Sequence, residues 1–204
     1  MTLHSALRHA RAASLVLGLS AATAGAQTLT FSTTGSFSGG GCSATSCTFG
    51  GFTLSFVNAP SASYFSGSLV DLGMFQTLAT GGTLPITAIP AGISFTLMIN
   101  QTAPGAGTNS FVDGISGTLA YDPSFSSLVW TPIQTVLQID GVTYDLLTDD
   151  NGRVNIAAPT TSQNPNTTVV KAFATVPEPS TIILLGSGLV GVIGAAQRHR
   201  RKAG

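Results

Sequence analysis

The strongest constraint on the fold is an alternation of apolar and polar residues that recurs between residues 27 and 175. Apolar side chains take every second position in several short runs, and Ser or Thr takes most of the positions between them. The clearest runs cover residues 29–31, 52–56, 93–99 and 142–147. A period of two residues is typical of a half-buried antiparallel strand. This part of the chain is therefore expected to be all-β.

Turn signals separate these runs. They are Gly81-Gly82, Pro104-Gly105, Asp122-Pro123, Asp140-Gly141 and Asn151-Gly152. Asp140-Gly141 predicts a two-residue hairpin between Val136–Ile139 and Val142–Leu147. Asn151-Gly152 predicts a second hairpin into Val154–Ala157, and a last strand is expected from Thr168 to Ala174. No helix is expected between residues 27 and 175. The pattern favours one domain, an antiparallel β-sandwich of about 8–10 strands that can take a jelly-roll-like form.

Charge excludes several kinds of function for residues 27–175. This body carries seven Asp against Arg153 and Lys171, a net charge of −5, and it contains neither His nor Glu. A Ser–His–Asp triad and a Cys/His zinc site are therefore excluded. Nucleic-acid binding is not expected either, because it needs a basic surface. The three histidines and most basic residues lie near the two ends of the chain.

Residues 1–26 have the pattern of a secretory signal peptide. Arg8, His9 and Arg11 precede a short run of small and apolar residues from Ala12 to Ala22. Ala24 and Ala26 then supply small residues at positions −3 and −1, which predicts cleavage by signal peptidase before Gln27. The apolar run is shorter than the roughly 20 residues of a spanning helix, so an uncleaved anchor is the weaker interpretation.

The C-terminal tail, residues 176–204, has three parts in a fixed order. A Pro-containing motif, Val176-Pro177-Glu178-Pro179-Ser180-Thr181, comes first. An uncharged apolar stretch follows from Ile182 to Ala196 and predicts a single transmembrane helix. A basic cluster ends the tail, and its charged residues are Arg198, Arg200, Arg201 and Lys202. The positive-inside rule places such a cluster in the cytoplasm, so the helix would hold an exported body at the membrane.

This tail closely resembles the PEP-CTERM sorting signal. The resemblance rests on Val176, Pro177, Glu178 and Pro179, on the apolar stretch behind them, and on the basic end. It implies processing by an exosortase, a membrane transpeptidase-like protease of Gram-negative bacteria that make exopolysaccharide. It also implies transient anchoring in the inner membrane, followed by release to the cell surface or to the extracellular biofilm matrix. It implies no activity for the body, because the bodies in this family are diverse.

Cys42 and Cys47 are the only cysteines, and they lie in a stretch rich in Gly and Ser. In an exported protein two such cysteines are expected to form a disulfide. A redox or metal pair is the alternative, but the spacing is not C-x-x-C and no His lies nearby.

The densest acidic cluster comprises Asp145, Asp149, Asp150 and Asn151. Oxygen ligands of this kind suit Ca²⁺, but the match to a D-x-[DN]-x-[DN]-G loop is incomplete because Gly152 follows too early. A solvated turn is the alternative. No other cofactor is expected.

Two further hypotheses concern sugars. A hydrolase would have to use a pair of Asp, of which Asp113 and Asp122 are the obvious candidates, yet both look like turn residues. Aromatic rings stack well on the apolar faces of sugars. The candidate glycan contacts are Tyr64, Tyr121, Trp130 and Tyr144.

These observations favour an exported, non-enzymatic, structural or adhesive β-sandwich protein. A carbohydrate-binding module for exopolysaccharide is the first alternative, and a secreted hydrolase is the second. The expected partners are signal peptidase, the exosortase and extracellular polysaccharide.

Overall fold

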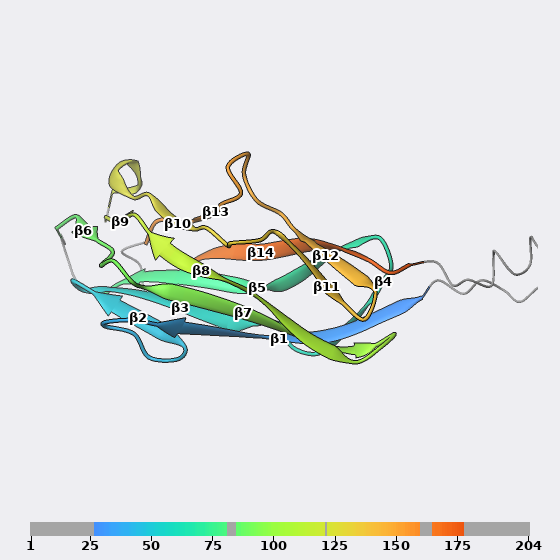
Figure 1. The fold of residues 1–204 in the computed structure, drawn as a ribbon. Coiled ribbons are helices and arrows are strands. Elements are labelled where there is room, and N and C mark those ends of the chain that lie inside the picture. Colours follow the sequence, from blue (N-terminus) through green and yellow to red (C-terminus); the bar gives the residue numbers. More distant parts are fainter. Residues whose placement is uncertain (1–26, 81–84, 121, 160–164, 178–204) are drawn as a thin grey trace, which may run out of the picture. The chain divides into compact units, whose positions relative to one another are not determined.

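The protein is described from a computed structural model that covers residues 27–80, 85–120, 122–159 and 165–177. These residues form two six-stranded sheets and a two-stranded one, and all strand pairs are antiparallel (Figure 1). A 3-10 turn, η1 (Pro123–Phe125), is the helical element within the described residues. The predicted all-β, antiparallel sandwich is therefore confirmed.

The first sheet has the order β13-β10-β8-β7-β1-β4. Its strands are β13 (Val154–Ile156), β10 (Leu128–Trp130), β8 (Gly107–Ser116), β7 (Ser94–Ala103), β1 (Thr28–Ser38) and β4 (Ala62–Phe65). The second sheet has the order β11-β12-β14-β5-β3-β2. Its strands are β11 (Val136–Ile139), β12 (Val142–Leu146), β14 (Asn166–Thr175), β5 (Ser68–Ala79), β3 (Phe52–Asn58) and β2 (Ser46–Phe49). The short strands β6 (Thr87–Ala88) and β9 (Thr118–Leu119) pair with each other.

Aromatic side chains from both sheets pack in the core between them. The ring of Phe95 on β7 lies 4.7 Å from that of Phe75 on β5 and 4.8 Å from that of Phe56 on β3, measured between centroids. Trp130 on β10 meets Phe95 edge to face at 5.2 Å. Tilted and edge-to-face pairs of this kind stabilise a core beyond the effect of area burial. The two sheets therefore share one core.

The alternation in the sequence predicts which side chains enter this core. In the four runs named above, the apolar positions of the alternation are buried, from Leu29 and Phe31 in β1 to Val142, Tyr144 and Leu146 in β12. The hairpin at Asp140-Gly141 is confirmed as well, because Ile139 pairs with Val142 across it. Both turn residues have positive φ angles, 46° and 81°, as a type I′ turn requires.

Two expectations about the strands are wrong. The described residues hold fourteen strands rather than about 8–10, because short strands of two to four residues add to the long ones. The turn at Asn151-Gly152 does not make a hairpin either. β13, which follows it, pairs with β10 in the first sheet, whereas β12 before it pairs with β11 and β14 in the second. A turn signal predicts a reversal of the chain, but the choice of pairing partner depends on long-range packing.

A buried polar contact joins the two sheets. The hydroxyl of Tyr144 on β12 donates a hydrogen bond to Oε1 of Gln101 on β7 at 2.8 Å. The side-chain amide of Gln101 donates in turn to the carbonyl of Gly105 at 2.9 Å. Tyr144 is 0% exposed and Gln101 is 1% exposed, and this burial raises the pKa of the Tyr144 phenol well above its usual range. The buried side chains of Tyr144 and Gln101 are thus both hydrogen-bonded.

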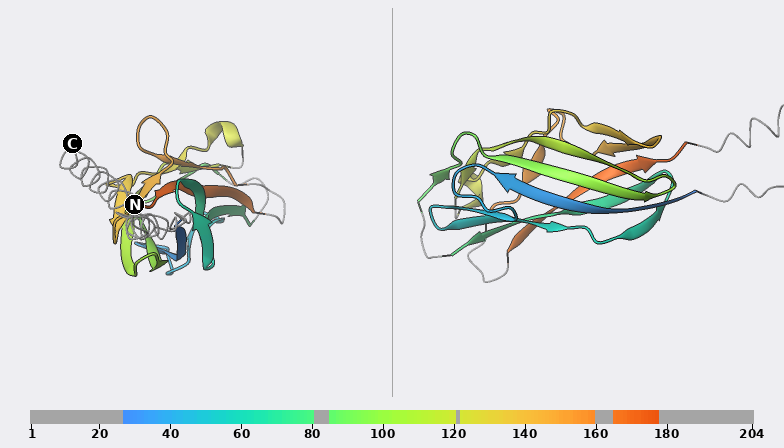
Figure 2. Two further views of the ribbon diagram at one scale, coloured as in Figure 1. Left: turned by 90° about the vertical axis from the view of Figure 1, so that its right-hand side faces the viewer. Right: turned by 60° about the horizontal axis from the view of Figure 1, so that its bottom comes forward.

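The body begins and ends at the same place. β1 starts and β14 finishes at one end of the sandwich, on the right in Figure 1, and the right-hand view of Figure 2 shows the same proximity. Among the residues described, no helix is both long and apolar enough to cross a membrane. The predicted signal peptide (1–26), the apolar stretch from Ile182 to Ala196 and the basic cluster at residues 198–202 lie outside the described residues.

Candidate functional site

Ser66 holds the first and the last described strands together. It lies in the turn between β4 and β5, and its N–H donates to the carbonyl of Gln27 at 3.3 Å. Its hydroxyl donates to the carbonyl of Val176 at 3.1 Å and accepts a hydrogen bond from the N–H of Val176 at 2.9 Å. The next residue, Gly67, donates to the carbonyl of Ala174 at 2.8 Å. We call the contacts of Ser66 with Gln27 and Val176 the Ser66 clasp.

Val176 belongs to the core although it lies beyond the last residue of β14. The alternation of β14 continues into it, so that Ala172, Ala174 and Val176 point inward while Thr175 and Pro177 are exposed. Val176 is 5% exposed. The backbone N–H and C=O of this residue are both bonded to Ser66, so its main chain is as fully engaged as that of a residue inside a sheet.

Pro177 lies against the β11–β12 hairpin. A methyl group added at Gly141 would stand 3.6 Å from Cγ of Pro177, which is ordinary van der Waals contact. Pro177, the last residue of this described segment, therefore lies beside this turn and next in the chain to the Ser66 clasp. Of the predicted sorting-motif residues, Val176 and Pro177 are described, and Glu178 and Pro179 lie outside the described residues.

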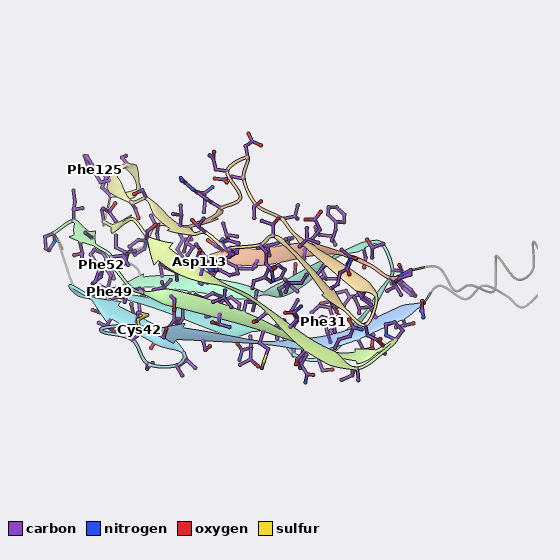
Figure 3. All side chains as sticks on the ribbon, in the orientation of Figure 1. Phe31, Cys42, Phe49, Phe52, Asp113 and Phe125 are labelled. Carbon is purple, nitrogen blue, oxygen red and sulfur yellow. A yellow bond between two sulfur atoms is a disulfide. The ribbon has the colours of Figure 1, made fainter. Side chains whose placement is uncertain are left out.

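The predicted disulfide is present. Cys42 and Cys47 are joined and their Cα atoms are 3.9 Å apart. Cys47 is fully buried on β2, whereas Cys42 is partly exposed in the loop before it. Figure 3 shows the sulfur atoms close to Phe49 and Phe52, toward the opposite end of the body from Phe31. The bond closes the irregular Gly/Ser-rich loop far from the Ser66 clasp.

Three residues of the acidic cluster, Asp149, Asp150 and Asn151, lie in a turn that the carboxylate of Asp149 stabilises. This carboxylate accepts hydrogen bonds from the N–H of Arg153 at 2.8 Å, the N–H of Asn151 at 2.9 Å and the side-chain amide of Asn155 at 3.3 Å. The bond from Arg153 is the main reason that the pKa of Asp149 lies below its ordinary value. Asp145 lies apart on the outer face of β12, opposite Val136 and Phe173.

These contacts bear on the predicted calcium site. Within the described residues, no three Asp, Glu, His or Cys side chains gather as metal ligands. The oxygens of Asp149 are engaged with donors of its own turn, as an Asx-type turn requires. The arrangement therefore explains Asp149 and Asn151 as turn residues, and calcium binding by Asp145, Asp149, Asp150 and Asn151 stays a prediction.

Two of the four proposed glycan-contacting aromatics are unsuitable. Trp130 and Tyr144 are both 0% exposed, so neither ring is open to a sugar, and the expectation for these two is wrong. Their strands turn them inward, where they meet other aromatic rings of the core. Tyr64 is half-buried and stacks on Phe31, with ring centroids 5.3 Å apart. Tyr121 lies outside the described residues.

A hollow of about 530 Å³ lies between residues 89–94 and 113–116. Asp113 on β8 lines it, and its carboxylate accepts a hydrogen bond from the N–H of Gly114 at 2.6 Å. Figure 3 labels Asp113 on this strand. Asp122, the other half of the suggested carboxylate pair, accepts from the N–H of Ser124 in the η1 turn and does not line the hollow. The hollow thus has one carboxylate and two serines, Ser94 and Ser116, and its other lining residues are glycine or apolar.

Sequence reasoning missed Ser66. The signal that points to it is a Ser-Gly pair between two alternating runs, because Gly67 has a φ of 76° that favours glycine in a turn. Nothing in the spacing of residues 66 and 176, which are 110 positions apart, indicates that they meet.

Comparison with known proteins concerns the C-terminal tail. Residues 175–201 match the family model of the PEP-CTERM protein-sorting motif, whereas no curated protein and no solved structure gives a significant match. The matched segment overlaps the described body at residues 175–177. This chain therefore carries a PEP-CTERM protein-sorting motif, which implies export and processing by an exosortase.

Proposed function

We propose that this protein is a non-enzymatic, structural or adhesive component of the cell surface or of the extracellular polysaccharide matrix. The observation that carries the proposal is that the sorting motif begins within the last core residues of a compact β-sandwich. The motif directs the whole body to the outside of the cell, so the body is the part that acts there. A rigid domain with a shared core and few charges suits a structural component.

The contacts that the aspartates make in the folded body support a role without catalysis. Asp113, Asp122 and Asp149 each accept hydrogen bonds from nearby backbone N–H groups, and Asp71 lies 3.7 Å from the amine of Lys171. Carboxylates used in this way are typical of turns and strand surfaces. A glycosidase instead needs two carboxyl groups facing each other across a cleft. The body also contains no histidine to act as a base.

The experiment compares the parent chain with a triple variant in the native host. In the variant, Pro177, Glu178 and Pro179 are replaced by Ala, which removes the motif and leaves the described strands unchanged. We expect the parent in the surface or matrix fraction and the variant in the membrane fraction, with weaker cohesion of the biofilm. A mature parent protein that is free in the medium, bound neither to cells nor to polysaccharide, would overturn the structural or adhesive role.

Carbohydrate binding is the competing function, and the hollow beside Asp113 favours it. Its volume of about 530 Å³ falls within the range of small-ligand sites, and a carboxylate suits sugar hydroxyls. Affinity electrophoresis through a gel that contains host exopolysaccharide tests it. Retardation of the parent that is lost in Asp113→Ala would establish a binding module. Equal mobility with and without polysaccharide would remove this function.

A further inference from the structure

The sorting signal and the folded body share residues. The family-model match starts at Thr175, but the core ends at Val176 and the described chain at Pro177. Val176 therefore belongs both to the sorting motif that the exosortase recognises and to the hydrophobic core of the body. Ser66 occupies both of its backbone hydrogen-bonding groups.

A protease binds its substrate as an extended, accessible segment on both sides of the bond that it breaks. A buried residue with a fully bonded main chain enters such a site only after local unfolding. Pro177 differs from Val176 in this respect, because its side chain is exposed and proline has no N–H to engage. The main chain is thus protected from a protease at Val176 and accessible to it at Pro177.

We propose that the body, through Ser66, sets the upstream limit of the exosortase cut, so that the broken peptide bond lies C-terminal to Pro177. This inference rests on the exosortase processing that the sorting motif implies. At the cut the C–N bond breaks, and the acyl carbon passes to water or to an amine acceptor at the cell surface. The downstream peptide leaves with a new amino group.

The predicted start of the mature chain is also bonded to Ser66. Gln27 is the predicted first residue after signal-peptide cleavage, and its carbonyl accepts the N–H of Ser66. Ser66 thus holds both the predicted first residue of the mature chain and Val176, the last residue of the core. A cut upstream of Val176 would remove a core side chain and free the end of β14. A cut after Pro177 leaves the core and the Ser66 clasp intact.

The first measurement is the intact mass of the mature protein, produced from the full chain in its native host. We expect chains that begin at Gln27 and end at Pro177 or later. Mature chains that end at Val176 or earlier would overturn this inference while leaving the sorting motif in place. A chain that keeps its whole tail would instead remove the processing on which both proposals depend, so the two failures are distinguishable.

The second measurement tests Ser66 itself. Mature parent, Ser66→Ala, Ser66→Thr and Ser68→Ala are treated with a broad-specificity protease, and the C-terminal residue is followed by mass. Ser68 is the matched control, because its hydroxyl bonds to the carbonyl of Phe65 within the same turn and does not touch Val176. Ser66→Thr keeps a hydroxyl and is expected to behave like the parent.

Ser66→Ala is expected to lose Val176 about fivefold faster than the parent or more, because two hydrogen bonds no longer oppose opening of the strand end. The global melting temperature, measured on the same samples, shows that each variant is folded. Loss of Val176 from Ser66→Ala at the rate of the parent and of Ser68→Ala would contradict the role given to Ser66.

Discussion

Replacing Tyr144 by Phe removes the hydroxyl that joins the two sheets and leaves the rest of the side chain in place. Oε1 of Gln101 then loses its donor at a site that is 1% exposed. A buried acceptor without a partner costs about 1–3 kcal/mol. For a domain of about 150 residues this corresponds to a melting temperature lower by about 2–12 °C. Thermal unfolding followed by circular dichroism measures this shift.

Two further variants test the reasoning. Tyr64→Phe is the control, because the described part of the chain provides no hydrogen-bond partner for that half-buried hydroxyl. The double variant Tyr144→Phe/Gln101→Leu makes both partners apolar and should cost less than the sum of the two single changes. A Tyr144→Phe variant that is no less stable than Tyr64→Phe would refute the idea that the inter-sheet hydrogen bond contributes to stability.

The same contact predicts a dependence on alkaline pH. Burial raises the pKa of Tyr144 above its ordinary value of 10.0, so the folded state binds this proton more tightly than the unfolded chain does. The resulting stability is fully present below pH 10 and is lost as the pH rises above it. Tyr144→Phe has no such proton, so the difference in unfolding free energy between parent and variant should shrink above pH 10.

Four other outcomes are expected. The hydrogen bond from the N–H of Arg153 is the main cause that lowers the pKa of Asp149. The ionised carboxylate of Asp149 therefore stabilises the fold above its ordinary pKa of 3.8, and this stabilisation is lost as the pH falls further. Asp149→Asn should make the melting temperature depend less on pH in the acidic range. Because donors of its own turn engage the carboxylate of Asp149, millimolar calcium should give the same melting temperature as a chelator, and a rise of several degrees would support the predicted calcium site. Gly117→Ala should lower the unfolding free energy, measured with denaturant, by more than about 1 kcal/mol, because φ is +118° and the new Cβ would lie 1.7 Å from a backbone oxygen. Gly40→Ala is the control and should be nearly neutral, because there is open space around Gly40. Reducing the Cys42–Cys47 bond, which closes a loop with a sequence separation of 5, should lower the unfolding free energy by about 2 kcal/mol, and an unchanged value would show that the loop is already ordered without it.

Local pattern predicted most of the strands because each alternating run has only one way to bury its apolar side. The run at residues 93–99 illustrates this, since Ile93, Phe95, Leu97 and Ile99 are all buried. The hairpin at Asp140-Gly141 was predictable for a similar reason, because a type I′ turn needs positive φ at both residues and few dipeptides supply it.

Pairings between distant strands were not predictable from these patterns. The chain after Asn151-Gly152 crosses to the first sheet, and no residue in the turn itself carries that information. The burial of the aromatic residues was not predictable either. The sequence alone does not distinguish a Trp or Tyr that stacks on a sugar from one that packs in the core, and Trp130 and Tyr144 are both buried. Ser66 was overlooked for the same reason, as its partner lies 110 residues away.

The position of β14 determines how the body responds to tension. β14 lies inside the second sheet, with β5 on one side and β12 on the other, and the sorting motif continues directly from it. A pull on the C-terminal end acts along the strand, whereas its hydrogen bonds to both neighbours run across it. The ladder is therefore loaded in shear, and many bonds must yield together rather than one after another. An attachment made through β14 would be mechanically strong.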